Sequence, residues 1–392
     1  MRNINVGLFG FGVVGGGIYK VLEAKPQLGV SIKKIVIKNP EKEREAPLNL
    51  FYTDANEIIE DDNLQLVVEL IDDSEAAYQI VKRSFEKGKS VISANKKMIA
   101  EHHEELIALS QTNGVSFLYE AAVCGSVPII RNLEEYFDND LLTHVKGIVN
   151  GSTNFILTQM SKYQSSYSEA LQLAQEKGFA ESNPLLDVEG FDAAYKLSII
   201  ALHAFGAKVK QNDIIKKGIT SIHQNDLIYA KEKGFQLKLI AQAVVNEQGQ
   251  ASLFSIIPSF VERSNPLGLT NNEYNGVLVG STLADEQFFY GKGAGRFPTS
   301  SAVLSDISAY KYGYKYEFKK GRNNNLVEVV REGRFFLSFP SNKIVDLSDF
   351  KTIEESYQSA NRNYVVGTLA YQKLKDHPFV NDASYSLIAF NE

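Results

Sequence analysis

Residues 4–17, which read INVGLFGFGVVGGG, decide how the first part of the chain folds. Ile4–Phe9 is a short, mostly apolar run of the kind that forms a buried strand. A glycine motif at 10–15 follows it at once, and a helical stretch at 16–23 comes next. Strand, GxGxxG motif and helix in this order are typical of a dinucleotide-binding unit. A purely structural glycine-rich turn is the alternative, and the flanking strand and helix make it the weaker interpretation.

Each glycine of this motif is expected to have its own physical role. Gly10 allows the tight turn, Gly12 lets a pyrophosphate approach the backbone, and Gly15 lets the helix pack closely on the strand. The amides of the loop would then face the anion, with the helix dipole behind them. The cofactor-binding residues expected in this motif are Gly10, Phe11, Gly12, Val13, Val14 and Gly15.

Strand-like and helix-like stretches then alternate through the first third of the chain. The expected strands are 32–37, 64–71, 90–93 and 115–119, and the helices between them are 74–87 and 98–112. This alternation predicts an α/β fold with a Rossmann-type, doubly wound parallel sheet, which binds ligands at the carboxyl ends of its strands. Asn95 and Lys96 follow the strand at 90–93, so we expect Asn95 at the cofactor. Lys96 is either a catalytic group or a solvated loop charge.

The end of the second strand bears on the choice between NADP and NAD. A fold that prefers NAD usually places an acid there for the ribose hydroxyl, whereas this chain has Lys38, Asn39 and Pro40. Lys38, helped by Arg44, could instead hold a 2′-phosphate. A solvated lysine at a strand end is an equally open interpretation, so the sequence only favours NADP over NAD.

The composition limits the kinds of protein that this chain can be. Its 392 residues, 44% of them hydrophobic, are enough for two or three domains with real cores. A net charge of -6 gives no basic surface for nucleic acid or an anionic membrane. One cysteine excludes a disulfide framework and suits a reducing cytoplasm. There is neither a signal-peptide pattern nor an apolar run near the ~20 residues of a membrane helix. We therefore expect a cytoplasmic protein with no nucleic-acid or membrane partner.

A second informative stretch lies at 178–206, GFAESNPLLDVEGFDAAYKLSIIALHAFG. Its second half reads as an apolar helix in which Asp192 and Lys196, four residues apart, share one face. Glu181, Asp187 and Glu189 precede this helix on a loop punctuated by Gly and Pro. Carboxylates gathered beside a lysine suit a small, polar, cationic substrate. The alternative is a structural ion pair between Asp192 and Lys196.

Two further stretches carry candidate chemistry. Cys124 follows the fifth expected strand and could be the thiolate nucleophile of an acylating aldehyde dehydrogenase. A lone cysteine among Ala, Val and Gly is more often a small buried residue. The second stretch begins at Asn150, Gly151 and Thr153, whose residue types suit a helix cap and a carboxylate-binding turn.

Several motifs together resemble one enzyme family, homoserine dehydrogenase. The motifs are, in order, GFGVVGGG, SANKK, EAAVCGSVP, NGSTNFIL, GFAESNPLLDVEGFDAAYKL and GKGAGRFPTSSAVLSDI, and they extend over about residues 4–307. The resemblance implies reversible NAD(P)-linked interconversion of L-homoserine and L-aspartate 4-semialdehyde, on the route to threonine and methionine. A non-catalytic nucleotide sensor with the same fold stays open as a second alternative.

The resemblance also implies roles for individual residues. Lys96 and Lys196 match the family's two active-site lysines. The substrate site matches Glu181, Asp187 and Asp192, with the turn at Asn150, Gly151 and Thr153 for the substrate carboxylate. Glu120, Val123 and Gly125 match a loop that holds a monovalent cation such as sodium, largely through backbone carbonyls. The glycine-rich loop containing Gly293 is expected to line the site.

We expect three parts along the chain. They are a dinucleotide-binding domain at 1–130, completed by a helix near 298–312, a substrate-binding and dimerisation domain of α+β type at 131–297, and a small C-terminal segment at 313–392. A mixed sheet in the second part is expected to serve as the platform for a homodimer. Two features depart from the family: the acids Asp72 and Asp73 near the cofactor, and a C-terminal segment without the clear strand expected of an ACT-type regulatory domain.

Overall fold

The computed structural model describes residues 3–138, 141–320, 327 and 330–391. The chain divides into two compact units. The first consists of Met1–Glu135 and Lys292–Lys319, and the second of Tyr136–Gly291 and Lys320–Glu392. Within the described ranges, no helix combines the length and the apolar character that crossing a membrane requires.

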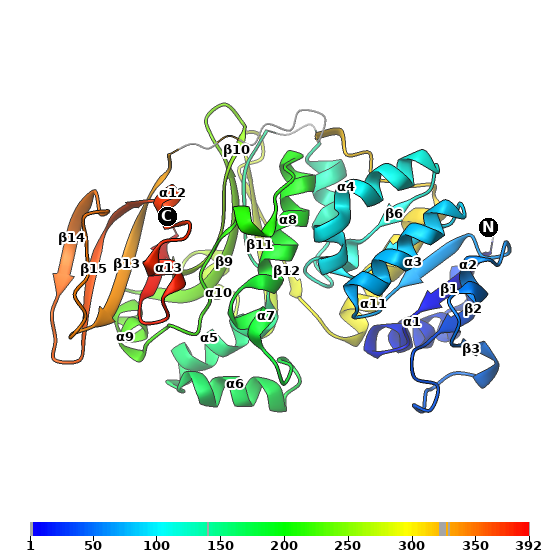
Figure 1. The fold of residues 1–392 in the computed structure, drawn as a ribbon, viewed down its shortest axis with the longest axis horizontal. Coiled ribbons are helices and arrows are strands. Elements are labelled where there is room, and N and C mark those ends of the chain that lie inside the picture. Colours follow the sequence, from blue (N-terminus) through cyan, green and yellow to red (C-terminus); the bar gives the residue numbers. More distant parts are fainter. Residues whose placement is uncertain (1–2, 139–140, 321–326, 328–329, 392) are drawn as a thin grey trace. The chain divides into compact units, whose positions relative to one another are not determined.

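The first unit is built on a six-stranded sheet in the order β3-β2-β1-β4-β5-β6 (Figure 1). Every neighbouring pair in it is parallel. The strands are β1 (Ile4–Phe9), β2 (Val30–Val36), β3 (Phe51–Tyr52), β4 (Leu66–Glu69), β5 (Ser90–Ser93) and β6 (Phe117–Leu118). This is the strand order of a Rossmann sheet, so the predicted fold class is confirmed.

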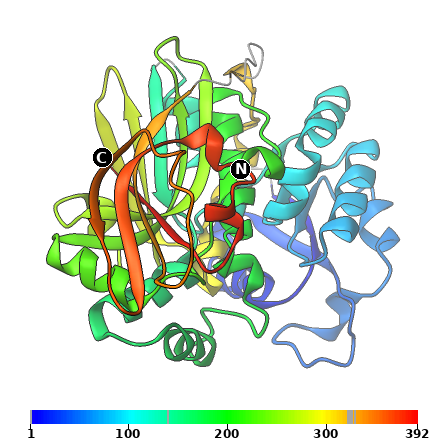
Figure 2. The same cartoon turned by 60° about the vertical axis from the view of Figure 1, so that its left-hand side comes forward.

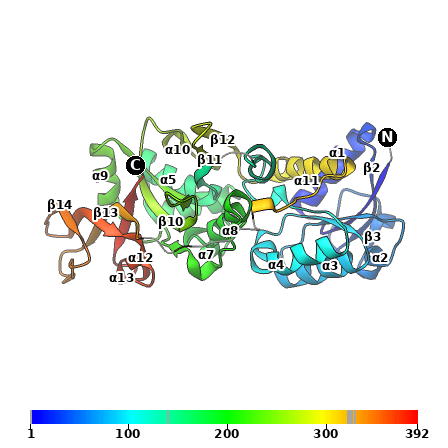
Figure 3. The same cartoon turned by 90° about the horizontal axis from the view of Figure 1, so that it is seen from above.

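Helices cover both faces of this sheet, as Figure 3 shows for the first unit. They are α1 (Val13–Ala24), α2 (Asn56–Ile59), α3 (Ser74–Glu86), α4 (Lys96–Thr112) and α11 (Arg296–Lys311). α1 and α11 pack together although they lie far apart in sequence. Their contact is close at Gly17, where an added Cβ would lie 2.4 Å from Ser300 Oγ. A late segment of the chain therefore completes the first unit.

The second unit is built on a ten-stranded sheet in the order β12-β11-β7-β9-β10-β16-β13-β15-β14, with β8 paired to β10. The strands are β7 (Leu142–Ile148), β8 (Ile215–Lys216), β9 (Phe235–Val245), β10 (Ala251–Glu262), β11 (Tyr274–Ser281), β12 (Glu286–Lys292), β13 (Glu332–Pro340), β14 (Thr352–Tyr357), β15 (Arg362–Ala370) and β16 (Ser386–Phe390). The sheet is mixed, because β10 pairs antiparallel with β9 and parallel with β16. This agrees with the mixed sheet predicted for the second domain.

The helices of the second unit lie on the two sides of its sheet. They are α5 (Gly151–Tyr163), α6 (Tyr167–Glu176), α7 (Leu185–Val188), α8 (Phe191–Phe205), α9 (Gln224–Glu232), α10 (Pro266–Leu269), α12 (Tyr371–Leu374) and α13 (Pro378–Asn381). In Figure 3, α5, α9 and α10 lie on one side and α7, α8, α12 and α13 on the other. Almost all of β9 and β10 is therefore buried on both faces, which explains their long apolar sequences.

The C-terminal segment differs from the sequence-based expectation. It was expected to lack a clear strand, whereas it contributes β13 to β16 (Figure 2). The order β16-β13-β15-β14 is that of a split βαβ unit, but the connection between β13 and β14 contains no helix. The strands form because the runs at 335–339 and 364–369 bury aromatic and β-branched side chains in a shared core. β16 then joins this group to β10.

Candidate active site

The nucleotide loop of the first unit has the geometry that its glycines predict. Gly10 has a φ of +89°, and an added Cβ there would lie 2.7 Å from the carbonyl oxygen of Leu70. A Cβ on Gly15 would lie 2.4 Å from the carbonyl oxygen of Gly10. Gly12 differs, because nothing lies within 4 Å of its added Cβ and no side chain caps α1 there. The loop is thus open at the position where the amides of α1 can receive a pyrophosphate.

Lys38 lies just beyond β2 and is exposed. None of the described residues forms a hydrogen bond or an ion pair with its ammonium group, so it can reach a ligand. Arg44, its expected helper, is engaged locally: its guanidinium donates to the carbonyl oxygens of Lys42 and of Asn39, the latter at 2.6 Å. Of the two acids at 72–73, Asp73 caps α3, because its Oδ1 accepts hydrogen bonds from the amides of the first turn.

A buried carboxyl group lies at the carboxyl ends of β4 and β5. Glu69 accepts hydrogen bonds from Ser93 Oγ at 2.5 Å and from the amide of Ile71 at 2.7 Å. Asn95 donates to the carbonyl oxygen of Ile71 at 3.0 Å and caps α4 by accepting from the Met98 amide. Burial raises the pKa of Glu69 to about 7. Sequence reasoning missed Glu69, although an acid inside the apolar run LQLVVELI is a visible signal.

Lys96 is the first residue of α4 and is partly buried. A helix N-terminus is an unfavourable place for a cation, because the helix dipole is positive there. Lys97, the next residue, is exposed. In the structure Lys96 lies beyond the carboxyl end of β5, at the edge of the sheet where a ligand is expected to bind.

The side chain of Glu120 holds the loop after β6 in place. Glu120 accepts hydrogen bonds from the amides of Ile130 at 2.8 Å and Arg131 at 2.9 Å, so its carboxylate is engaged within the protein. The loop meets the glycine-rich loop from the far end of the sequence: an added Cβ on Gly125 would lie 2.4 Å from the Gly293 carbonyl oxygen. Cys124 between them is only 1% exposed.

In the second unit, one buried cluster joins α8 to the start of α5. Lys196 Nζ donates to Asp192 Oδ2 at 2.7 Å and to the Val149 carbonyl oxygen at 2.8 Å. Asn150 Nδ2 donates to the same Asp192 oxygen at 2.8 Å and to Asp187 Oδ1 at 2.7 Å. Asn150 therefore bridges two carboxylates. Lys196 keeps its third N–H without a partner among the described residues.

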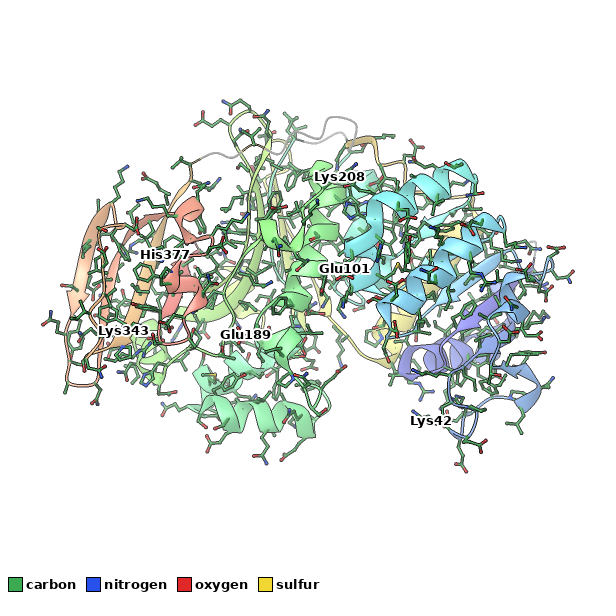
Figure 4. All side chains as sticks on the ribbon, in the orientation of Figure 1. Lys42, Glu101, Glu189, Lys208, Lys343 and His377 are labelled. Atoms are coloured by element: carbon green, nitrogen blue, oxygen red, sulfur yellow. The ribbon has the colours of Figure 1, made fainter. Side chains whose placement is uncertain are left out.

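The remaining substrate-site candidates fall into two groups. Thr153 belongs to the cluster, because its amide donates to Asn150 Oδ1 at 2.8 Å. A glycine is required at 151 because the start of α5 lies against the backbone of Glu273: an added Cβ would lie 2.7 Å from the Glu273 carbonyl oxygen. Glu181 is exposed and has no hydrogen bond to the cluster. Glu189, labelled in Figure 4, is turned toward the loop after β8, where it accepts from Thr220 Oγ1 at 2.6 Å.

Asn275 is a further member of this site that the sequence did not indicate. It is fully buried on β11, and its Nδ2 donates to the Val149 carbonyl oxygen at 3.1 Å, so it shares that acceptor with Lys196. Its Oδ1 is buried and has no partner in the described part of the chain. A single asparagine in a strand carries no sequence signal, because only the fold brings it to Val149.

Comparisons with known proteins agree with this arrangement. The family model described as homoserine dehydrogenase, NAD binding domain, matches residues 10–120, and the model described as homoserine dehydrogenase matches residues 128–308. The homoserine dehydrogenase of Bacillus subtilis is 39% identical over 318 residues, which cover 79% of this chain and 73% of that protein. The chain belongs to the homoserine dehydrogenase family. Homoserine dehydrogenases are NAD(P)-dependent oxidoreductases that act on a CH–OH group, so the predicted enzyme class is confirmed.

Other homoserine dehydrogenases extend the comparison. That of Lactococcus lactis is 36% identical over 315 residues, covering 78% of this chain and 73% of that protein. The crystal structure from Thiobacillus denitrificans has a TM-score of 0.88 at 27% identity and covers 100% of this chain and 99% of that one. A structure of the Staphylococcus aureus enzyme has a TM-score of 0.77 at 27% identity, with the same coverage. The C-terminal strands therefore lie within the matched fold.

Proposed function

We propose that this protein catalyses the reversible NAD(P)-linked interconversion of L-homoserine and L-aspartate 4-semialdehyde, in threonine and methionine biosynthesis. The observation that carries the proposal is the buried cluster around Lys196, in a chain that also has an open nucleotide loop at Gly12. A structural ion pair would have its donors satisfied within the protein. Lys196 instead has two acceptors for three N–H groups, and its third can reach a substrate oxygen.

The two lysines divide the proton chemistry. A cofactor bound at the Gly10–Gly15 loop would supply reversible hydride transfer at the terminal carbon of homoserine. The third N–H of Lys196 donates to the reacting oxygen and stabilises the negative charge that develops there during hydride transfer. Lys96, when neutral, accepts the hydroxyl proton as the carbon–oxygen double bond forms, and it returns that proton in the reverse direction. General acid–base help of this kind is worth about 10²–10⁴ in rate.

The acids and the start of α5 bind the amino-acid end of the substrate. Asp187 is held by Asn150 at 2.7 Å and is the acid that best matches the substrate ammonium group, with Glu181 as a second, exposed candidate. Asn150 and Thr153 bond to each other, so they position this site rather than contact the carboxylate. The amide of Gly151, in the first turn of α5, is then the group that receives the carboxylate.

In this proposal the cofactor would bind along the motif from Gly10 to Gly15, and Asn95 and Gly293 would lie near its nicotinamide. The exposed Lys38 would hold a 2′-phosphate, which favours NADP. A monovalent cation such as sodium fits the carbonyl oxygens of Val123 and Gly125, which accept no hydrogen bond from any described residue. Glu120 shapes that loop through the amides of Ile130 and Arg131.

We also propose a division of the chain into domains, a homodimer and a cytoplasmic location. We retain the dinucleotide-binding domain at 1–130 with its helix near 298–312, the substrate domain at 131–297 and the C-terminal segment at 313–392. A homodimer is supported by β12, an edge strand that exposes Phe288 and Tyr290. A single buried cysteine fits a cytoplasmic enzyme.

The test is an assay of NADPH and NADH oxidation with L-aspartate 4-semialdehyde. We expect turnover that depends on the semialdehyde and yields homoserine. Cys124→Ser should keep this activity, because a buried cysteine takes no part in hydride transfer. Absence of turnover with both cofactors, in a protein that binds NADPH, would favour a nucleotide sensor. Loss of activity in Cys124→Ser alone would reinstate the acylating mechanism.

A further inference from the structure

A cavity of about 380 Å³ lies in the second unit, on the side of the sheet that carries α5, α9 and α10. The end of α5, the end of α9, the start of β9 and the turn containing α10 form its walls. Its size falls within the range of small-molecule sites in proteins, roughly 300–1,000 Å³. None of the residues assigned above to the cofactor or to the substrate lines this cavity.

The charge of the lining is one-sided. Four cationic residues line the cavity, and no aspartate or glutamate does: Lys162, Lys231, Lys238 and Arg263. Among the described residues, no ion pair involves any of these four side chains. A concentration of like charges without a counter-charge raises the local concentration of anions and favours binding of a group with more than one negative charge.

One of the four cationic side chains, that of Lys238, is buried in the wall of the cavity. It is 1% exposed, and its ammonium group donates to the carbonyl oxygen of Thr270, to Asn271 Oδ1 at 3.0 Å and to Asn154 Oδ1 at 3.3 Å. All three acceptors are neutral, so the buried charge has hydrogen bonds but no counter-ion. Burial accordingly lowers the pKa of Lys238 to about 7. An anion in the cavity would supply the missing counter-charge.

The remaining lining residues offer a hydrogen-bond donor and an apolar surface to a ligand. Ser161 Oγ is buried in this wall and has no hydrogen-bond partner in the described structure, so it is available to an acceptor. Leu157, Leu227, Leu237 and the partly exposed ring of Phe235 provide apolar surface. The cavity thus combines a cationic part with an apolar part.

We propose that this cavity binds a small organic phosphate, with the phosphate group against Lys231 and Arg263 and its apolar part against the leucines and Phe235. Lys238 contributes its charge from behind the wall, because its donors are already used. Lys162 and Lys231 also lie at the ends of α5 and α9, where a cation stabilises the helix dipole. That second role affects helix stability alone and leaves anion binding unchanged, so the two can be measured separately.

The experiment is an isothermal titration of the full chain with phenyl phosphate, with saturating NADP⁺ present to occupy the nucleotide loop. Lys231→Ala and Arg263→Ala should each raise the Kd about tenfold, the scale of one charge-assisted hydrogen bond. Lys177→Ala, an exposed lysine at the end of α6, is the matched control and should leave the Kd unchanged. Inorganic phosphate, which lacks the apolar part, should bind at least tenfold more weakly than phenyl phosphate.

Three outcomes would overturn the proposal. The first is absence of a saturable heat at millimolar phenyl phosphate. The second is an unchanged Kd in the Lys231→Ala/Arg263→Ala double variant, with a circular dichroism spectrum like that of the wild type. The third is equal affinity for inorganic and phenyl phosphate, which would remove the apolar part of the site. A lower melting temperature of Lys231→Ala without any change in Kd would assign Lys231 to the stability of α9 alone.

Discussion

Replacing Lys196 by methionine separates catalysis from stability in the cluster on α8. The substitution removes one member of a pair that is joined at 2.7 Å. It leaves the carboxylate of Asp192, which is 6% exposed, without its cationic partner while the Asn150 amide still donates to it. Breaking a buried pair in this way costs about 3–5 kcal/mol of unfolding free energy. Loss of the N–H that we propose donates to the reacting oxygen should lower kcat/KM by roughly 10²-fold or more.

The double variant Asp192→Asn/Lys196→Met is the control. It leaves no buried charge at this position, so its unfolding free energy should return to within about 1–2 kcal/mol of the wild type. Its kcat/KM should stay as low as that of Lys196→Met. Both quantities come from urea denaturation and from initial rates of NADPH oxidation. If Lys196→Met keeps wild-type kcat/KM and loses only stability, the pair is structural and the catalytic role of Lys196 is refuted.

The remaining predictions concern the first unit. Gly12→Val should abolish nucleotide binding while unfolding stays cooperative, since the side chain enters open space that the pyrophosphate needs; undiminished affinity in a fluorescence titration would contradict the placement. Lys38→Ala should weaken NADP binding by about 1–3 kcal/mol and leave NAD binding nearly unchanged, and an equal loss for both cofactors would make Lys38 a structural residue. The pKa of Glu69 is raised from 4.5 to about 7 in the folded protein. Protonation of Glu69 therefore adds to the free energy of unfolding, and this contribution is complete below pH 4.5. That contribution, roughly 3 kcal/mol, is lost as the pH rises through 7 toward 8. Glu69→Gln should remove this part of the pH dependence, as measured by denaturation at pH 5 and pH 8.

The strands of the first unit could be predicted closely because each is a short apolar run that is visible in the sequence. The expected strand at 90–93 coincides with β5, and Ile4–Phe9 coincides with β1. The helix expected at 74–87 begins at Ser74 as predicted, whereas α4 and α11 begin earlier than expected, at Lys96 and Arg296. In α11 the cap is Gly295 with a φ of +118°, a conformation that residue types alone do not reveal.

The site could be predicted in part. Asp192 and Lys196 were placed together because a helix brings residues four apart onto one face, and the structure joins them. Asn150 was expected to bind the substrate, whereas its amide bridges Asp187 and Asp192, a contact between segments that no local pattern encodes. Asn275 and Glu69 were missed for the same reason: their roles depend on tertiary neighbours.

The position of β16 has a consequence for the order in which the sheet assembles. β16 is the last strand in the sequence, but it lies between β10 and β13, which are synthesised before it. Until β16 is in place, β13 presents an unpaired edge, and β10 presents one beyond its short pairing with β8. Strands β13 to β15 then have no attachment to the sheet through β10. Assembly of this sheet therefore waits for its final strand, so a newly made chain passes through a stage in which two open edges are exposed to neighbouring chains.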